Sequence, residues 1–300
     1  MVQLTVINVH NSQLSTLNSH LSTLLAVGLV ALVVFQSCQK ASLSENDSSD
    51  SDPATDANLV VVVTNKGLTS TRLNFAIYDL GGTRQKQVNQ QSSAADFGSA
   101  AFQLEEGTYQ LVVVGHNANG NPTMTNPAKI QFKNNQGFTD TFIHYDTITI
   151  GDESQTLRVS LDRIVSMCRF VINDSIPDDI SQMKFYYTGG SGAFDAATGL
   201  GSVNSKQEMK FGVTSGHTWT AFDLYTFLHQ QRGTIHLTVT ALDDSGSEHS
   251  KREFDVPMQQ NQITWFTGSF FHSQSRADKW IIIPKADINT TWLYESYYRY

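Results

Sequence analysis

Short runs in which apolar and polar residues alternate dominate the chain from residue 58 onward. Residues 73–82, for example, alternate Leu73, Phe75 and Ile77 with Ala76 and Tyr78, then end in Gly-Gly. A period of two predicts β-strands, and segments rich in Gly, Asn and Asp predict the turns between them. Strands are predicted over residues 58–63, 73–82, 107–121, 130–132, 140–151, 155–174, 182–190, 233–247, 252–257, 262–271 and 278–284. Many short strands with turn-forming connections indicate an all-β fold built from β-sandwiches.

One segment departs from this pattern. Residues 219–230, with the sequence WTAFDLYTFLHQ, are the best helix candidate in the chain. Two other segments are predicted to be turns or loops: residues 243–248 should form a hairpin turn, and the GGSG sequence at residues 189–192 should be a loop.

The length of the chain predicts two domains. Its 300 residues suffice for two cores of ordinary size. GTYQLVVV at residue 107 resembles GTIHLTVT at residue 233, as two related domains in tandem would give. We therefore predict an N-terminal β-sandwich over residues 58–160 and a C-terminal β-sandwich over residues 161–300.

The first 37 residues have the pattern of an export signal. Residues 24–35 form an uncharged apolar run of a length that suits a signal peptide and is too short for a membrane span. Ser37, a small residue, precedes Cys38, so we predict cleavage between them and lipid attachment at Cys38. The segment 35–38 resembles a bacterial lipobox. No Lys or Arg precedes Lys40, so this is an atypical leader, or the true start lies further along the chain.

Residues 38–57 form an acidic, serine-rich segment with one large apolar residue, Leu43. Such a segment buries too little surface to offset its chain entropy, and we predict a disordered tether. It resembles the signal that directs Bacteroidetes lipoproteins to the cell surface, although a plain spacer is the alternative. The alternative for Cys38 is an ordinary buried cysteine.

Charge and composition narrow the classes of function. The formal net charge of -8 argues against nucleic-acid binding. Two cysteines exclude a disulfide scaffold, and Cys168 lies in an apolar strand-like run that predicts a buried thiol. The nine histidines show no metal-ligand spacing, and we find no catalytic or cofactor motif. The sequence therefore predicts a binding or structural protein that has no metal and no cofactor.

Four segments resemble the FimB-type fimbrial anchor subunits of Bacteroidetes, in the same order along the chain: residues 107–115, 157–172, 186–199 and 261–271. The resemblance implies two transthyretin-like β-sandwich domains, no enzymatic activity, and a lipid anchor in the outer membrane. It also implies fimbrial pilin subunits as partners, at the base of a type V pilus.

The resemblance also implies that subunits join by strand addition, in which main-chain hydrogen bonds supply affinity and alternate side chains supply specificity. The first strand, 58–63, follows the tether directly, and no arginine precedes Arg72. We therefore expect this strand to stay in place and end the polymer. In the segment 287–300, the side chains of Trp292, Tyr294, Tyr298 and Tyr300 would share one face of an extended strand. That segment is either a donor strand for a partner or an edge strand of its own domain.

Other functions remain open. A carbohydrate-binding lipoprotein could use a platform of tryptophans at positions 219, 265, 280 and 292, although tryptophans in a sandwich are more often in the core. A tip or minor adhesin subunit of the same fold, or an enzyme of unknown class, are further alternatives.

Overall fold

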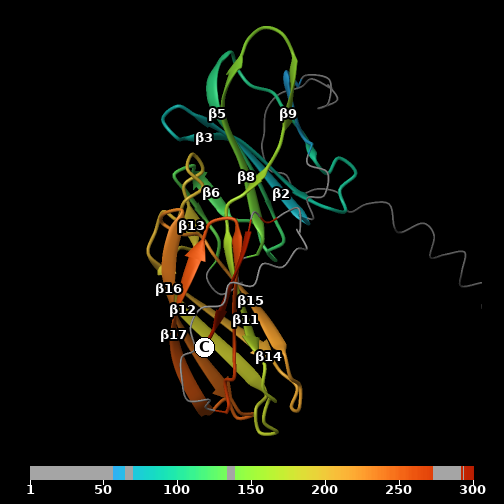
Figure 1. Ribbon diagram of the computed structural model, residues 1–300. Helices are drawn as coiled ribbons and strands as arrows, with labels where there is room; N and C mark the ends of the chain where they lie inside the picture. The colour runs from blue at the N-terminus through green and yellow to red at the C-terminus, as the bar shows by residue number, and fades with distance from the viewer. Residues whose placement is uncertain (1–56, 65–69, 134–138, 273–291, 293) are drawn as a thin grey trace, which may run out of the picture. The chain divides into compact units, whose positions relative to one another are not determined.

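The computed structural model describes residues 57–64, 70–133, 139–272, 292 and 294–300. Within these ranges every regular element is a β-strand, which confirms the predicted all-β class (Figure 1). The described part of the chain accordingly contains no helix of the length and hydropathy needed to cross a membrane. The predicted leader 1–37 with Ser37 and Cys38, the tether up to residue 56, the strand at 278–284 and Trp280 lie outside the described residues.

Two sheets pack face to face in the first part of the chain, and we call them the N-terminal sheet pair. One has the strand order β4-β1-β9 and the other β10-β8-β5-β2-β3. The strands are β1 (Leu59–Val63), β2 (Arg72–Asp79), β3 (Arg84–Gln91), β4 (Ser99–Phe102), β5 (Gly107–His116), β8 (Thr141–Ile150), β9 (Gln155–Val159) and β10 (Asp162–Arg163). Alternate residues such as Leu59, Phe75 and Val113 fill the space between the sheets.

The second part of the chain forms the C-terminal sheet pair, with the orders β15-β11-β18-β19 and β14-β12-β16-β17. The strands are β11 (Ser166–Ile172), β12 (Gln182–Gly190), β14 (Ser205–Gly212), β15 (Thr220–Thr226), β16 (Arg232–Leu242), β17 (Glu248–Gln259), β18 (Gln262–Gly268) and β19 (Tyr294–Arg299). Its core is rich in aromatic rings, with Phe170, Phe185 and Phe266 near the centre. Cys168 is buried in the same core, as predicted.

A third, small sheet links segments that are distant in sequence. It has the order β13-β7-β6, formed by β6 (Thr123–Asn126), β7 (Lys129–Gln131) and β13 (Ala193–Phe194). It borders a further apolar cluster that contains Val112 and Val114 of β5 as well as Met167 and Ile263 of the C-terminal sheet pair. Both faces of β5 are therefore buried, which explains the unbroken apolar run in that strand. The division into two domains near residue 160 stays a prediction.

The prediction of a helix over residues 219–230 is wrong. This segment contains β15, whose side chains alternate between half-exposed and buried, with Phe222 and Leu224 turned into the core. β15 pairs antiparallel with β11 along its whole length. Trp219, just before it, has a φ of 55°, which a helix does not allow. The aromatic residues that resembled one helix face instead suit a strand because they pack on a pleated sheet.

The predicted hairpin turn at residues 243–248 agrees with the structure, whereas the predicted loop at residues 189–192 agrees only in part. β16 and β17 form a hairpin whose turn is closed by hydrogen bonds from the Asp243 N–H to the Ser247 carbonyl and from the Gly246 N–H to the Asp243 carbonyl. In the GGSG segment, Gly189 and Gly190 are the last residues of β12, and only Ser191 and Gly192 connect that strand to β13. The run 155–174, read as continuous from the sequence, is divided into β9, β10 and β11, which belong to three different sheets.

Candidate functional site

The first strand, β1, lies between two other strands. It pairs antiparallel with β4 and parallel with β9, so it is the central strand of its sheet. Leu59 and Val61 are fully buried in the core of the N-terminal sheet pair. At the start of the strand, the Asn58 amide donates a hydrogen bond to the Leu104 carbonyl and accepts one from the Leu104 N–H. Removing β1 would leave two unpaired sheet edges and an open core.

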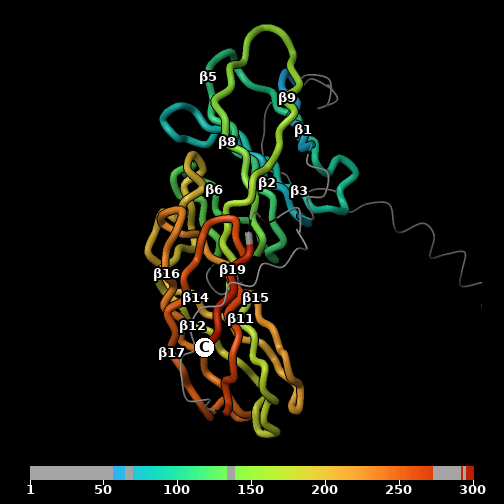
Figure 2. The backbone as a smooth tube through the Cα atoms, viewed as in Figure 1, coloured from blue at the N-terminus to red at the C-terminus, as the bar shows by residue number. Residues whose placement is uncertain are grey.

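The last strand, β19, lies at a sheet edge. It pairs parallel with β18, with Gln262 opposite Tyr294 and Thr267 opposite Arg299, and has no strand on its other side in the described residues. In Figure 2 it runs, coloured red, among the strands of the C-terminal sheet pair. This is the arrangement of an edge strand packed on its own chain, one of the two alternatives for this segment.

The inward face of β19 ends in an aromatic pocket. Tyr298 and Tyr300 pack against the core of the C-terminal sheet pair. The Tyr300 ring stacks on Phe170 with a centroid distance of 4.6 Å and on Phe266 at 5.2 Å. Its hydroxyl donates a hydrogen bond of 3.0 Å to the Val171 carbonyl, and burial raises its pKa, so the donor proton stays in place. The Tyr300 side chain is therefore partly buried and packs against the core.

Gly268, the last residue of β18, makes room for the chain terminus. A Cβ atom built on it would meet the Tyr300 carbonyl oxygen at 2.2 Å and the Tyr300 ring at 2.7 Å. Contacts this short do not occur between real atoms, so any side chain at this position would push Tyr300 away. A glycine within a strand pattern marks this kind of close backbone approach.

The outward face of β19 extends a row of side chains that crosses four strands. The row comprises Asp223, Arg169, Trp265 and Tyr297, which are successive partners in the sheet. Arg169 forms a two-pronged ion pair with Asp223, at 2.7 and 2.8 Å, and its guanidinium lies 4.8 Å from the Trp265 ring centroid. Trp265 stacks on Tyr297 at 5.7 Å, and both donate hydrogen bonds to Glu295. β19 is thus held on both faces.

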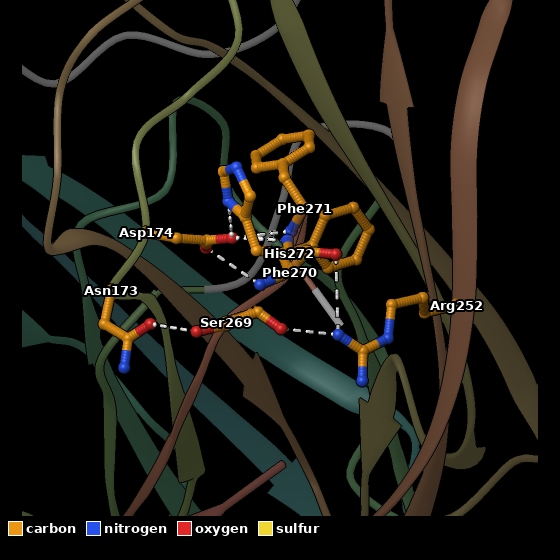
Figure 3. Close-up of polar contacts among 7 residues, drawn as sticks. All are labelled: Asn173, Asp174, Arg252, Ser269, Phe270, Phe271 and His272. Carbon is orange, nitrogen blue, oxygen red and sulfur yellow. Dashed lines mark hydrogen bonds and ion pairs between the residues drawn. The ribbon is translucent and has the colours of Figure 1, made fainter. Parts of the chain in front are cut away.

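A set of polar contacts, which we call the latch, holds the backbone just after β18 (Figure 3). We define the latch as Asp174, the backbone of Phe270, Phe271 and His272, and Arg252. The Asp174 carboxylate accepts hydrogen bonds from the three backbone N–H groups, at 2.8, 2.8 and 2.9 Å, and lies 3.2 Å from the His272 ring. Burial acts to raise the Asp174 pKa, but these hydrogen bonds outweigh it and hold the pKa below its ordinary value.

Arg252 connects the latch to the terminal tyrosine. Its guanidinium donates hydrogen bonds to the carbonyls of Ser269, at 2.6 Å, and Phe270, at 3.5 Å. It also lies 5.4 Å from the Tyr300 ring centroid, within the range of a cation–π contact. The Ser269 hydroxyl in turn donates to Asn173, next to Asp174. Arg252 therefore contacts both the backbone that follows β18 and the ring of Tyr300.

Trp292 does not pack beside Tyr300; it lies in the apolar cluster shared by both sheet pairs. Its ring lies 3.9 Å from the guanidinium of Arg163, and the same guanidinium lies 4.7 Å from the Phe142 ring. Arg163 is held in plane by two hydrogen bonds to Asp140, at 2.6 and 2.7 Å. Trp292 is 8% exposed, so its side chain is buried in this cluster.

The structure separates the predicted donor-strand residues into two groups. Tyr298 and Tyr300 share the inward face of β19, whereas Trp292 enters a different cluster. Tyr294 begins β19 and its backbone pairs with Gln262; its side chain lies outside the described residues. Sequence reasoning missed Asp174, Arg252 and Gly268. Only Gly268 carried a signal, as a glycine within a strand pattern.

Other chemistry in the described residues is sparse. No three His, Cys, Asp or Glu side chains in these ranges lie close enough together to hold a metal ion. Burial raises the pKa of the Cys168 thiol, which keeps it protonated and weakly nucleophilic. Of the predicted tryptophan platform, Trp219 is 67% exposed, while Trp292 is buried and Trp265 is engaged by Arg169 and Glu295.

Comparisons with known proteins give one family model and several similar solved structures. The family model described as fimbrillin-A associated anchor proteins Mfa1 and Mfa2 matches residues 53–263. A candidate adhesin from Bacteroides ovatus is 15% identical with a TM-score of 0.50, over 72% of this chain and 88% of that one. No curated protein matches in sequence.

Two further solved structures are similar with lower TM-scores. The fimbrial anchor protein Mfa2 from Porphyromonas gingivalis is 14% identical, with a TM-score of 0.40, over 65% of this chain and 80% of that one. A fimbrial assembly protein from Parabacteroides distasonis is 13% identical, with a TM-score of 0.34, over 71% and 90%.

Proposed function

Because the chain belongs to the family of fimbrillin-A associated anchor proteins, we propose that it is a lipoprotein that ends a fimbria at the outer membrane. The family is one of fimbrial structural proteins and not of enzymes. The finer proposal has three parts: an acyl anchor at Cys38, a first strand that stays in the fold, and a C-terminal segment that joins the neighbouring pilin by strand addition.

The position of β1 is the observation that carries this proposal. A central strand with buried Leu59 and Val61 contributes two sets of main-chain hydrogen bonds and part of a core, so the fold loses both if the strand leaves. In this sequence the proposed tether leads into β1 directly, and no arginine precedes Arg72. A protease specific for arginine would have no site between Cys38 and β1. A subunit tied to the membrane before its first strand must keep that strand, which suits the last subunit of a polymer.

The lipid anchor is tested by labelling cells with an alkyne analogue of palmitate. The full chain and the Cys168→Ala variant should carry the label and fractionate with the outer membrane. The Cys38→Ala variant should lose both. Cys168 is the matched control because it is the second cysteine of the sequence and is buried in the core. Label retained by the Cys38→Ala variant would contradict the proposed attachment site.

The fimbrial role is tested by isolating the lipidated protein from outer membranes and identifying co-purifying proteins. We expect a pilin, and we expect the mature chain to retain residues 58–63 by peptide mass analysis. A mature chain that lacks these residues, or a preparation without any pilin, would refute the proposal of a terminal anchor.

The role of the C-terminal segment needs a separate test. If residues 287–300 are the donor strand, a chain that ends at Pro284 and still folds should fail to join pili. A truncated chain that folds and still joins pili would reject the donor role while leaving the anchor role intact. Folding of the truncated chain is checked by thermal unfolding, because Trp292 and Tyr300 are lost with the strand.

A further inference from the structure

The outer face of the β14-β12-β16-β17 sheet carries a polar pocket that the proposed fimbrial role does not use. The pocket has a volume of about 340 Å³, at the lower end of the range of small-molecule sites. Six side chains provide its polar groups: Tyr186, Thr188, His236, Thr238, Glu253 and Asp255.

Strand register explains why these side chains converge. Thr188, His236 and Asp255 are direct partners across β12, β16 and β17, and so form one row. Tyr186, Thr238 and Glu253 form the adjacent row on the same three strands, two residues along. Residues two apart on a strand face the same side. The pocket is therefore a block of two rows on three paired strands, which fixes the spacing of its functional groups.

The groups in the pocket have unused hydrogen-bonding capacity. Within the described residues, the hydroxyls of Tyr186, Thr188 and Thr238 have no protein partner. His236 Nδ1 lies 2.5 Å from an Asp255 carboxylate oxygen, which orients the imidazole and leaves Nε2 without a partner. Each hydroxyl can both donate and accept, and the carboxylates accept only. The site thus offers a mixture of donors and acceptors beside one aromatic ring.

This mixture of hydrogen-bond donors, acceptors and one aromatic ring favours some classes of ligand over others. An anion would meet the carboxylates of Glu253 and Asp255, and Glu208 is the cross-strand neighbour of Tyr186. An apolar ligand would leave the hydroxyls unpaired, at a cost in free energy. A simple ammonium group would use the carboxylates alone. A sugar presents hydroxyls to the polar groups and a C–H face to an aromatic ring.

We propose that this pocket binds a neutral hexopyranoside. Tyr186 supplies the ring surface, Thr188, Thr238 and the His236 Nε2 exchange hydrogen bonds with sugar hydroxyls, and Glu253 and Asp255 accept from them. The site lies on the face of the sheet opposite the core and is independent of Cys38, β1 and β19, so it adds a binding activity to the proposed anchor.

The test is titration of the full chain with the methyl glycosides of glucose, galactose, mannose and N-acetylglucosamine, followed by saturation-transfer and chemical-shift NMR. A single sugar ring in an open site should give a Kd on the order of 1 mM for at least one of them. Tyr186→Ala and His236→Ala should each weaken binding about tenfold or more, whereas Tyr186→Phe should retain most of it.

Trp219→Ala is the matched control, because Trp219 is an exposed aromatic residue outside the pocket. It should bind the sugar as the unaltered chain does. Thermal unfolding checks that each variant is folded, and Glu253→Gln replaces any variant that is not. Four results would overturn the proposal: no saturation by any of the glycosides up to 20 mM, unchanged binding in folded pocket variants, loss of binding in Trp219→Ala, or tighter, salt-sensitive binding of N-acetyl-lysine amide.

Discussion

Replacing Trp292 by alanine should destabilise the protein strongly, because this side chain is buried in the cluster shared by the two sheet pairs. Trp292 is 8% exposed and packs at 3.9 Å on the guanidinium of Arg163. Truncation of a buried Trp costs about 3–5 kcal/mol, of which a desolvated cation–π contact supplies about 1–2 kcal/mol. Arg163 would keep Asp140 and Phe142 as partners, so no buried charge is left unpaired.

The loss is large compared with the whole stability of a domain, which is about 5–15 kcal/mol. It corresponds to a fall in Tm of roughly 6–20 °C for a protein of about this length. Urea unfolding curves at pH 7, with matched thermal scans, would measure both quantities.

Trp219→Ala is the control for Trp292→Ala. Trp219 is 67% exposed, so its removal should change the free energy of unfolding by no more than about 0.5 kcal/mol. The two tryptophan variants should therefore differ by at least about 2.5 kcal/mol. If they differ by less than about 1 kcal/mol, the Trp292 side chain does not stabilise the cluster shared by the two sheet pairs, and the packing argument for this residue fails.

Three further predictions concern the same structure. Gly268→Ala should displace Tyr300, because the carbonyl oxygen of Tyr300 would lie 2.2 Å from the new Cβ atom. Amide hydrogen exchange should then become faster in β19 alone, and unchanged exchange would contradict the close approach. Asp174→Asn should cost about 1.5–3 kcal/mol at pH 7, because a charged acceptor of three N–H groups is lost, and the difference from the unaltered chain should shrink as pH falls through the lowered pKa of Asp174. Burial, with the Arg72 charge as the smaller cause, lowers the pKa of His116 to about 4, so the unfolded chain takes up a proton before the folded one. Stability should then fall as pH drops from about 6.5 to about 4, by up to about 3 kcal/mol, and His116→Gln should flatten this part of the urea-derived profile.

The alternation of apolar and polar residues predicted most of the fold, and its failures have physical causes. β3 is a partly exposed edge strand with the sequence RQKQVNQQ, so it shows almost no apolar face. β14 buries Gln207 and packs Met209 and Phe211 against the core, yet charged residues surround them in sequence. Strands at sheet edges bury less than central ones and leave a weaker pattern. The misread segment 219–230 had the opposite difficulty, since its aromatic residues suit a helix face and a strand equally.

The site at the C-terminus could be predicted only in part. Aromatic residues at alternate positions indicated that Tyr298 and Tyr300 would share a face, and they do. The latch could not be predicted, because Asp174 and His272 are 98 residues apart and meet only through the order of strands in the sheet. The pairing of β19 with β18 could not be predicted either, because the glycine at position 268 signals a close backbone approach but does not identify Tyr300 as the residue that approaches.

The strands β1 and β19 differ in how many contacts the fold would lose if the strand left it. β1 is bonded on both sides and fills the core with Leu59 and Val61, whereas β19, among the residues that the structure describes, is bonded to β18 alone. An edge strand exposes one unpaired edge when it leaves, and a central strand exposes two, so β19 is the strand that a partner could exchange at the lower cost. The packing of Trp292 and Tyr300 still has to be replaced. If the C-terminal segment is a donor strand, the groove of the pilin that receives it must therefore offer aromatic pockets for these two side chains, at the spacing that an extended strand gives them.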